Sequence, residues 1–311
     1  MKHRILTVSS ANLDLDAKLN TAPEGGQTVI GTEYSYVPGG KGANSAVTVA
    51  RLGFDSILCA RLGRDSAADR LMALYRAEGI DTRFIARDSV NPTGLALILI
   101  EESGQNRIVV YPGANMALSP SDAEYAFTAY PDALLMQLEI GRETILWSAE
   151  TARRQGIPVI IDAGPAVSDF PLEKLGPVDI FSPNESECAA YTGITPSGAD
   201  SCFAACMALE KRIQAKYYVL KLGGRGCYVY DGKYCRSFPP YEVDVVDTTA
   251  AGDAFTAALT VEYLSSGSIS RAAVFANVVG SLTVSKSGAS SSIPTLAEVR
   301  RFMGERDIRL K

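Results

Sequence analysis

The sequence predicts a three-layer α/β/α fold, in which helices cover both faces of a mostly parallel central sheet. Short apolar runs of strand type alternate with helical runs along most of the 311 residues. Polar or glycine-rich clusters follow the predicted strands, which is typical of sheets that bind ligands beyond their carboxyl ends. Hairpin-rich stretches near 15–37 and 94–112 interrupt this alternation. Residues 1–311 are therefore expected to form one domain with a small inserted β-sheet lid.

The predicted elements follow one another with short connections. A first strand at 5–9 leads into Asn12 and Asp14, and the β-branched and aromatic residues at 28–37 indicate one or two strands. A helix follows the glycine-rich segment 38–44 and ends at Leu52-Gly53. Further strands are expected at 56–60, 94–101, 107–111, 134–138, 158–162, 179–182, 217–222, 226–230 and 234–238. Further helices are expected at 67–78, 142–154, 185–191, 199–215, 253–264, 270–285 and 295–303.

The composition is that of an ordinary globular protein, with 47% hydrophobic and 21% charged residues. The net charge is −5, and no basic cluster interleaves with aromatic residues, so a nucleic-acid surface is not expected. The apolar runs at 94–100 and 133–138 are too short to span a bilayer, and no membrane association is expected. The start of the chain lacks the features of a secretory signal, so a cytoplasmic location is expected.

The scarcity of histidine restricts the chemistry. His3 is the single histidine, so a Ser-His-Asp or Cys-His catalyst, a histidine metal site or a histidine proton shuttle would all depend on it. Acid–base chemistry is therefore expected from carboxylates, lysine, tyrosine or cysteine. The six cysteines contain no CxxC pair, and reduced, mostly buried thiols are expected.

The segment 246–255 joins a β-branched, extended stretch to a predicted helix, with small residues at the junction. The first N–H groups of a helix are unpaired and carry partial positive charge, so such a junction can bind an anion. Asp253 lies just inside the helix and could act on a group beside that anion. Equally, an acidic residue in a first turn can serve only to complement the helix dipole.

Two further clusters have both a functional and a structural interpretation. Gly39-Gly40-Lys41-Gly42 lets the backbone approach a ligand, with Lys41 and Asn44 three residues apart at a helix start. Its spacing is not that of a P-loop, and a simple glycine-rich turn before a helix is the alternative. Asn12 and Asp14 could bind adjacent hydroxyl groups, or could form an Asx turn.

Two clusters in the second half of the chain are similarly open. Asn184 and Glu187 lie three residues apart at a helix start, where they could organise a hydrated Mg²⁺ or form a capping box. The segment 222–226 could pass close to a flat ligand, or could be a hairpin turn.

Together, the motifs Gly39–Asn44 and Asp247–Asp253 resemble the two signatures of the ribokinase-like (PfkB) carbohydrate kinases. The order and spacing of the segments 113–115, 118–120, 134–139 and 183–187 also agree with that family. The resemblance runs from about residue 4 to residue 303. It implies an ATP-dependent sugar kinase, with D-ribose as the expected sugar.

The resemblance also implies the roles of the acceptor site and the catalytic groups. Asp253 would be the general base that accepts the proton of the attacking hydroxyl. The amides of Ala250, Ala251 and Gly252 would form an anion hole over the transferred phosphoryl group. Besides Asp253, the sugar would be held by Asn12, Asp14, Gly40, Lys41, Gly42, Asn44 and Glu139.

Nucleotide and cations have implied positions as well. Asn184 and Glu187 would organise Mg²⁺ and the ATP phosphates through water. The nucleotide pocket would be lined by Lys221, Leu222, Gly223, Gly224, Arg225, Gly226 and Asn277. A monovalent cation, usually K⁺, would lie at Asp247, Thr249, Thr283, Lys286, Gly288 and Ser292.

The sequence departs from the family pattern at two positions. Ala250 stands where many members have glycine, which is acceptable if its φ angle is negative. Asp162 stands where asparagine is more common, which slightly favours another pentose or a ketohexose over ribose.

Three alternatives accompany this interpretation. The chain could be a kinase for another acceptor, such as deoxyribose, fructose, adenosine or pseudouridine, or a sugar-binding protein without activity. A nicotinamide dehydrogenase is disfavoured because the first strand leads into Ser9–Asn12 and not into a GxGxxG motif. Because unpaired apolar strand edges tend to associate, a homodimer through the lid at 15–37 and 94–112 is also expected.

Overall fold

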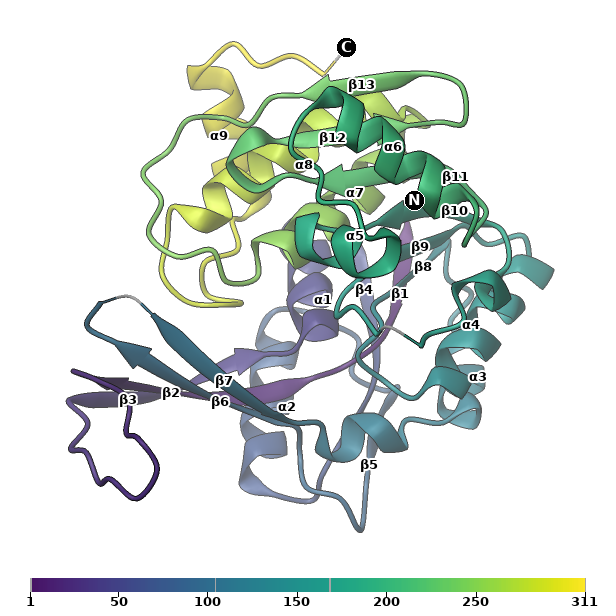
Figure 1. Ribbon diagram of the computed structural model, residues 1–311. Coiled ribbons are helices and arrows are strands. Elements are labelled where there is room, and N and C mark those ends of the chain that lie inside the picture. Colours follow the sequence, from purple (N-terminus) through teal and green to yellow (C-terminus); the bar gives the residue numbers. More distant parts are fainter. Residues whose placement is uncertain (1, 104, 168, 311) are drawn as a thin grey trace.

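The computed structural model describes residues 2–103, 105–167 and 169–310. A nine-stranded sheet with the order β13-β12-β11-β10-β9-β8-β1-β4-β5 forms its centre (Figure 1). The seven strands β11, β10, β9, β8, β1, β4 and β5 are parallel to one another. Strands β12 and β13 are added as antiparallel strands at the β11 edge. The strands are β1 Arg4–Val8, β4 Asp55–Leu62, β5 Ile85–Arg87, β8 Ala133–Met136, β9 Val159–Asp162, β10 Val178–Ser182, β11 Ala215–Lys221, β12 Cys227–Tyr230 and β13 Cys235–Phe238.

Helices cover both faces of this sheet because successive strand residues point to opposite sides. Ile5 packs into a core shared with helices α1, α2, α7, α8 and α9, whereas its neighbour Leu6 packs into a separate core with α3, α4, α5 and α6. The predicted three-layer arrangement is therefore confirmed. The helices are α1 Lys41–Arg51, α2 Ser66–Ala77, α3 Pro120–Phe127, α4 Arg142–Arg154, α5 Glu185–Thr192, α6 Ala199–Glu210, α7 Ala251–Ser266, α8 Ile269–Val284 and α9 Leu296–Glu305.

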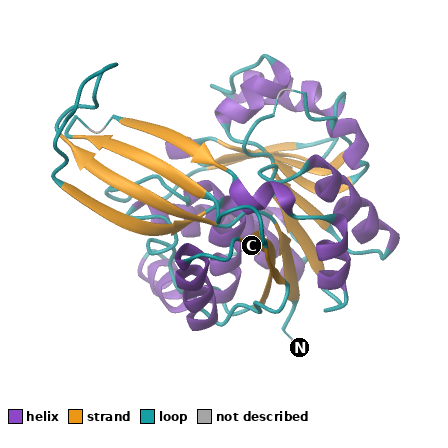
Figure 2. Cartoon of the chain, turned by 90° about the horizontal axis from the view of Figure 1, so that it is seen from below, coloured by secondary structure: helices purple, strands orange, loops and turns teal. Residues whose placement is uncertain are grey.

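A second, smaller sheet extends away from this body (Figures 1 and 2). It has the strand order β3-β2-β6-β7, with bounds β2 Asn12–Leu19, β3 Glu33–Gly39, β6 Leu95–Glu101 and β7 Asn106–Tyr111. Both ends of the chain segment 12–39 return to the main body, since β1 precedes it and α1 follows it. The hairpin-rich segments of the sequence thus meet in one sheet outside the central one.

Several predicted elements differ from the structure. The helix expected at 199–215 ends at Glu210, because β11 already begins at Ala215 and Ile213 is buried in the connection between the two elements. Residues 28–32 form no strand. Ile30 is 93% exposed, so no apolar surface supports extended pairing there.

Strand β2, helix α3 and strand β5 are absent from the predicted elements, and one extended stretch is not a strand. Helix α3 begins at a capping box between Ser119 and Asp122, and β5 is only three residues long. The stretch before the small-residue junction forms no strand, with Val245 and Val246 more than half exposed. In the described part of the chain, no helix has the length and apolar character needed to cross a membrane. All six thiols are free, and only Cys235 among them is exposed.

Candidate active site

The candidate site lies where the order of the central strands reverses. The chain passes from β1 to β4 on one side and later returns to β8 on the other side of β1. Such a reversal opens a crevice beyond the carboxyl ends of the two strands. Asn12 follows β1 and Glu139 follows β8, so the two residues flank this crevice.

Asp253 lies in the first turn of α7 and is 5% exposed. The first turn of α1 faces it: Asn44 Nδ2 donates to Asp253 Oδ2 at 2.9 Å, and Lys41 Nζ lies 3.5 Å from Oδ1. Burial raises the pKa of Asp253, although the nearby Lys41 ammonium acts in the opposite direction. The same carboxylate raises the pKa of Lys41. A buried carboxylate with a raised pKa is a suitable proton acceptor for an alcohol.

The start of α7 carries backbone strain that the sequence analysis did not expect. Ala250 has φ +61°, in the left-handed region, so the negative angle assumed for an alanine here is wrong. That conformation costs a non-glycine residue about 1–2 kcal/mol. The turn also engages one predicted anion-hole donor, because the Ala251 N–H donates to the Thr248 carbonyl at 3.3 Å.

Glu139 and Asn12 are held by partners that the sequence analysis did not assign. Glu139 Oε2 accepts hydrogen bonds from the Ser10 hydroxyl and from the Lys41 N–H. Asn12 Oδ1 accepts from Asn115 Nδ2 at 2.7 Å. Asn115 is 1% exposed and also binds the backbone N–H that precedes Asn12. Its only sequence signal was its place in the 113–115 segment of the family pattern.

Two buried acceptors at this site have no donor among the residues that the structure describes. They are Asp14 Oδ1 and Asn44 Oδ1. Burial raises the pKa of Asp14 to about 7. Gly39 makes room for this carboxylate, since a side chain there would collide with it. An unpaired buried acceptor costs about 1–3 kcal/mol, and a ligand rich in hydroxyl groups would supply the donors.

Asn184 and Glu187 form the capping box that was one of their two predicted interpretations. Each donates its backbone N–H to the other's side chain at 2.8 Å. The second carboxylate oxygen of Glu187 lies next to Gly164, where any side chain would collide with it. The carboxylate is therefore fixed at the rim of the site, with one oxygen outside the capping box, which suits a water-mediated contact with Mg²⁺.

The residues predicted to line the nucleotide pocket are brought together only in part. Arg225 bonds to Glu185 and to the carbonyls of Pro196 and Ser197, so its side chain points toward the α5–α6 connection. Asn277 donates to the carbonyls of Phe238 and Pro239, which fixes the segment after β13. The segment Gly223–Arg225 forms a 3₁₀ turn after β11.

Asp162 does not join the residues around Asn12 and Asp14. Its Oδ2 accepts a hydrogen bond from Lys221 Nζ at 2.7 Å and one from Thr256 Oγ1 at 2.6 Å. The side chain is fully buried at the end of β9. Among the described residues, Asp162 therefore makes no direct contact with Asn12 or Asp14 that would support its suggested influence on the choice of sugar.

Of the six positions predicted for a monovalent cation, five lie on two adjoining loops and Thr283 lies in the last turn of α8. Asp247 accepts hydrogen bonds from the N–H and hydroxyl of Thr249 and from the N–H of Gly288, all at 2.7–2.9 Å. Burial acts to raise the pKa of Asp247, but these hydrogen bonds outweigh it and the pKa is lowered. Three other side chains have protein partners: Lys286 bonds to Glu298, and the hydroxyls of Thr283 and Ser292 donate to backbone carbonyls. Oxygen ligands of this kind fit a hard cation.

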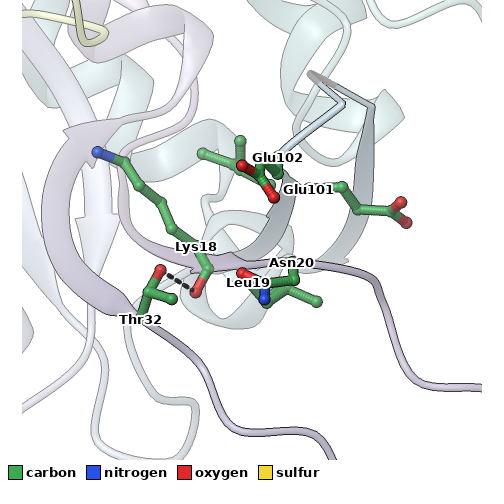
Figure 3. Close-up of a pocket in the computed structure, with 7 residues that line it drawn as sticks. Lys18, Leu19, Asn20, Thr32, Glu101 and Glu102 are labelled. Carbon is green, nitrogen blue, oxygen red and sulfur yellow. Dashed lines mark hydrogen bonds between the residues drawn. The ribbon is translucent and has the colours of Figure 1, made fainter.

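A separate hollow lies at the far end of the small sheet (Figure 3). It has a volume of about 290 Å³ and includes Lys18, whose carbonyl accepts the Thr32 hydroxyl at 3.2 Å. Lys18 is six residues along β2 from Asn12, or roughly 20 Å at the rise of a strand. This hollow is therefore not part of the candidate active site. Its lining residues are Lys18, Leu19, Asn20, Thr32, Ile100, Glu101 and Glu102.

Comparison with known proteins places the chain in a family. Residues 2–296 match the model of the pfkB family of carbohydrate kinases. The chain belongs to this family and is thus an ATP-dependent phosphotransferase with an alcohol group as acceptor.

Among its relatives, the ribokinase of Haemophilus influenzae is 34% identical over 308 residues, covering 97% of this chain and 99% of that protein. A bifunctional ribokinase/ribose-5-phosphate isomerase A of Fructilactobacillus sanfranciscensis is 35% identical over 94% of this chain, which spans about half (54%) of that longer protein. A deoxyribokinase of Salmonella typhi is 28% identical over 96% of this chain and 98% of its own length. Arabidopsis thaliana ribokinase, solved in complex with ribose and ATP, superposes with a TM-score of 0.89 at 30% identity over 97% of this chain and 99% of that one.

Proposed function

We propose that this kinase phosphorylates D-ribose at its primary hydroxyl, giving D-ribose 5-phosphate and ADP. The proposal is carried by the contact of Asp253 with Asn44 and Lys41, together with the unpaired acceptor of Asp14. Together they combine a proton acceptor with buried groups that call for hydroxyl donors. The similarity to ribokinases over almost the whole chain supports ribose as the sugar.

In the proposed reaction, the oxygen of the ribose hydroxyl bonds to the γ-phosphorus of ATP, and Asp253 takes the proton of that hydroxyl. The bond to the β-phosphate oxygen breaks and ADP leaves with that electron pair. The amides at Ala250 and Gly252 and the positive end of α7 stabilise the transferred charge. Lys41 Nζ lies 3.5 Å from Asp253 Oδ1 and adds a positive charge. Positioning and charge stabilisation supply most of the catalysis in phosphoryl transfer.

Two cations complete the proposed site. Asn184 and Glu187 would hold Mg²⁺ through water, and Mg²⁺ when bound neutralises phosphate charge. The loops of Asp247, Thr249 and Gly288 would hold K⁺, with carbonyls of Thr283, Lys286 and Ser292 as further oxygen ligands. A cation bound there would hold these loops in place, and with them the turn that leads into the start of α7.

The small sheet has two proposed roles within one kinase domain that spans the chain. Because β2 carries Asn12 and Asp14, movement of this sheet would close the sugar site and exclude water. One face of it carries Tyr34, Tyr36, Val109 and Tyr111, each at least 48% exposed. An apolar sheet face of this kind suits pairing with a second copy of the chain. A homodimer is expected, and a monomer by light scattering at micromolar concentration would contradict it.

Deoxyribose is the second candidate sugar, since a deoxyribokinase is among the relatives. The sugar is identified by measuring ADP release with ribose, deoxyribose, fructose, adenosine and pseudouridine, each with and without K⁺. We expect the highest kcat/KM with ribose, stimulation by K⁺, and activity in the cytoplasm, where ATP is supplied. A higher kcat/KM with deoxyribose would reassign the substrate. Sugar binding with no ADP release would favour a binding protein.

A further inference from the structure

A buried ionic cluster lies beneath the start of α7, at the ends of two central strands. It consists of Asp162 at the end of β9, Lys221 at the end of β11 and Thr256 on α7. Asp162 Oδ2 lies 2.7 Å from Lys221 Nζ and 2.6 Å from Thr256 Oγ1, and Lys221 Nζ lies 3.5 Å from that hydroxyl. The side chains of Asp162 and Lys221 are 1% and 9% exposed.

The ammonium group of this cluster lies close to one residue of the predicted anion hole. A Cβ built on Gly252 would lie 3.7 Å from Lys221 Nζ, so the ammonium borders the backbone that presents the Gly252 N–H. The Lys221 backbone is anchored as well. Its N–H donates to the Pro183 carbonyl at 2.9 Å, and Lys221 forms an isolated parallel β-bridge with Asn184. Lys221 thus connects the helix start that carries Asn184 with the start of α7.

Stability alone is a poor explanation for such a pair. Burying two opposite charges costs about as much as their attraction returns, and apolar replacements are often neutral or stabilising. A buried charge pair bordering a catalytic carboxylate is more typical of a functional site. Both charges also act on the base: Asp162 raises the pKa of Asp253, and Lys221 lowers it.

We propose that Lys221 is a catalytic residue whose ammonium group contacts the oxygens of the transferred phosphoryl group, and that Asp162 and Thr256 are positioning residues that aim it. The inference rests on the proposed function, because it assigns a second cation, besides Lys41, to the same phosphoryl transfer. Lys221 exchanges no proton in the step. Its charge offsets the negative charge that builds up as the β–γ bond breaks, and the hydroxyl proton still goes to Asp253.

The test measures kcat, KM and pH profiles of Lys221→Met and Asp162→Asn with ribose and ATP. Lys221→Met should lower kcat about 100-fold and leave the sugar Kd within about twofold, since the lost contact forms in the transition state. Lys216→Met is the matched control, because Lys216 lies on the same strand and bonds to the Tyr263 hydroxyl at 2.9 Å. It should keep the kcat of the unmodified enzyme.

The pH profile tests whether both charges act on Asp253, and kcat separates a catalytic cluster from a structural one. Asp253 is faced by Lys41 and Asn44 of α1, by Asp162 of β9 and by Lys221 of β11. Removing the Lys221 charge should move the acid limb of kcat to higher pH, whereas Asp162→Asn should move it to lower pH and reduce kcat about tenfold. A purely structural pair would lower the melting temperature of both variants and leave kcat of the folded protein within about twofold.

The outcomes distinguish this inference from the proposed function. An unmodified enzyme that releases no ADP with any sugar would refute both. An active enzyme whose Lys221→Met variant keeps kcat within twofold, or whose two variants shift the acid limb in the same direction, would overturn only the role of Lys221. If Lys221→Met does not fold, Asp162→Asn, which preserves the size of the side chain, carries the test through its expected tenfold loss of kcat.

Discussion

Asn44 and Asp253 join the starts of two helices, with Asn44 Nδ2 donating to Asp253 Oδ2 at 2.9 Å. The contact orients the carboxylate of α7 from α1, and both residues are about 5% exposed. It leaves Asn44 Oδ1 without a donor among the described residues. Asn44 can therefore hold the base with one end of its amide and accept a sugar hydroxyl with the other.

Asn44→Ala should lower kcat/KM for ribose about 100-fold. The change removes a hydrogen bond to the sugar, so KM should rise. It also frees the Asp253 carboxylate to rotate, so kcat should fall. Steady-state ADP release measures the effect. Asn20→Ala, in the exposed hollow at the far end of β2, is the control and should be silent; equal losses in the two variants would refute the role of Asn44.

Asp14→Asn should change stability and sugar binding in opposite directions. With its pKa raised to about 7 from an ordinary 3.8, Asp14 keeps its proton in the folded protein between about pH 4 and 7, where the unfolded chain has lost it. The free energy of unfolding therefore falls as pH rises through that window. The neutral amide should avoid this loss and stabilise the ligand-free protein by at least about 1 kcal/mol at pH 8. Denaturant unfolding at pH 5 and pH 8 measures the difference.

The same variant should weaken ribose binding at least tenfold, because a carboxylate is the stronger hydroxyl acceptor. Affinity of the unmodified protein should also decline below about pH 7, as Asp14 takes up its proton. Asp16→Asn is the matched control two residues along β2, where burial also raises the pKa. It should add stability at high pH and leave the ribose Kd unchanged. A ribose Kd that does not change with pH or with Asp14→Asn would contradict this account.

Ala250→Gly should stabilise the protein slightly. Glycine adopts φ +61° without the cost of about 1–2 kcal/mol, but it loses about 0.5–1 kcal/mol of chain entropy on folding. We expect a net gain of about 0.5 kcal/mol and an unchanged kcat. Ala257→Gly, inside the same helix, should instead cost about 1 kcal/mol. Thermal unfolding of both variants tests the contrast, and a loss of stability at both positions would be inconsistent with strain at Ala250.

Asp247→Asn should weaken activation by K⁺. The carboxylate fixes Thr249 and Gly288 through hydrogen bonds and supplies the negative charge of the two loops. The K⁺ concentration for half-maximal turnover should rise at least several-fold, at constant ionic strength. Asp244→Asn lies three residues earlier on an exposed stretch and serves as control. Unaltered K⁺ dependence in Asp247→Asn would remove these loops from consideration as the cation site.

Local patterns predicted much of this fold because they act within a few residues. Helix α4 has the bounds expected for it, Arg142–Arg154, and the two hairpin segments meet in the small sheet. The failures lie where distant contacts decide. Residues 28–32 have strand propensity but form no strand, with Ile30 93% exposed, and the 199–215 helix ends early because the strand β11 begins at Ala215.

The candidate site divides in the same way. Motif spacing located Asp253, Lys41 and Asn44, and the structure brings these three into contact. Spacing gave no information on which strand ends face each other. The Ser10–Glu139 and Asp162–Lys221 contacts join residues 129 and 59 positions apart, and only the assembled sheet brings them together.

The central claim is that Asp253 is the general base of a sugar kinase. Its most direct test is the turnover of Asp253→Asn, with ribose binding measured on the same sample by calorimetry. The account predicts a kcat at least about 1,000-fold lower, a ribose Kd within a few-fold of the unmodified value, and no loss in the control Asp244→Asn. Near-normal turnover of Asp253→Asn would contradict it.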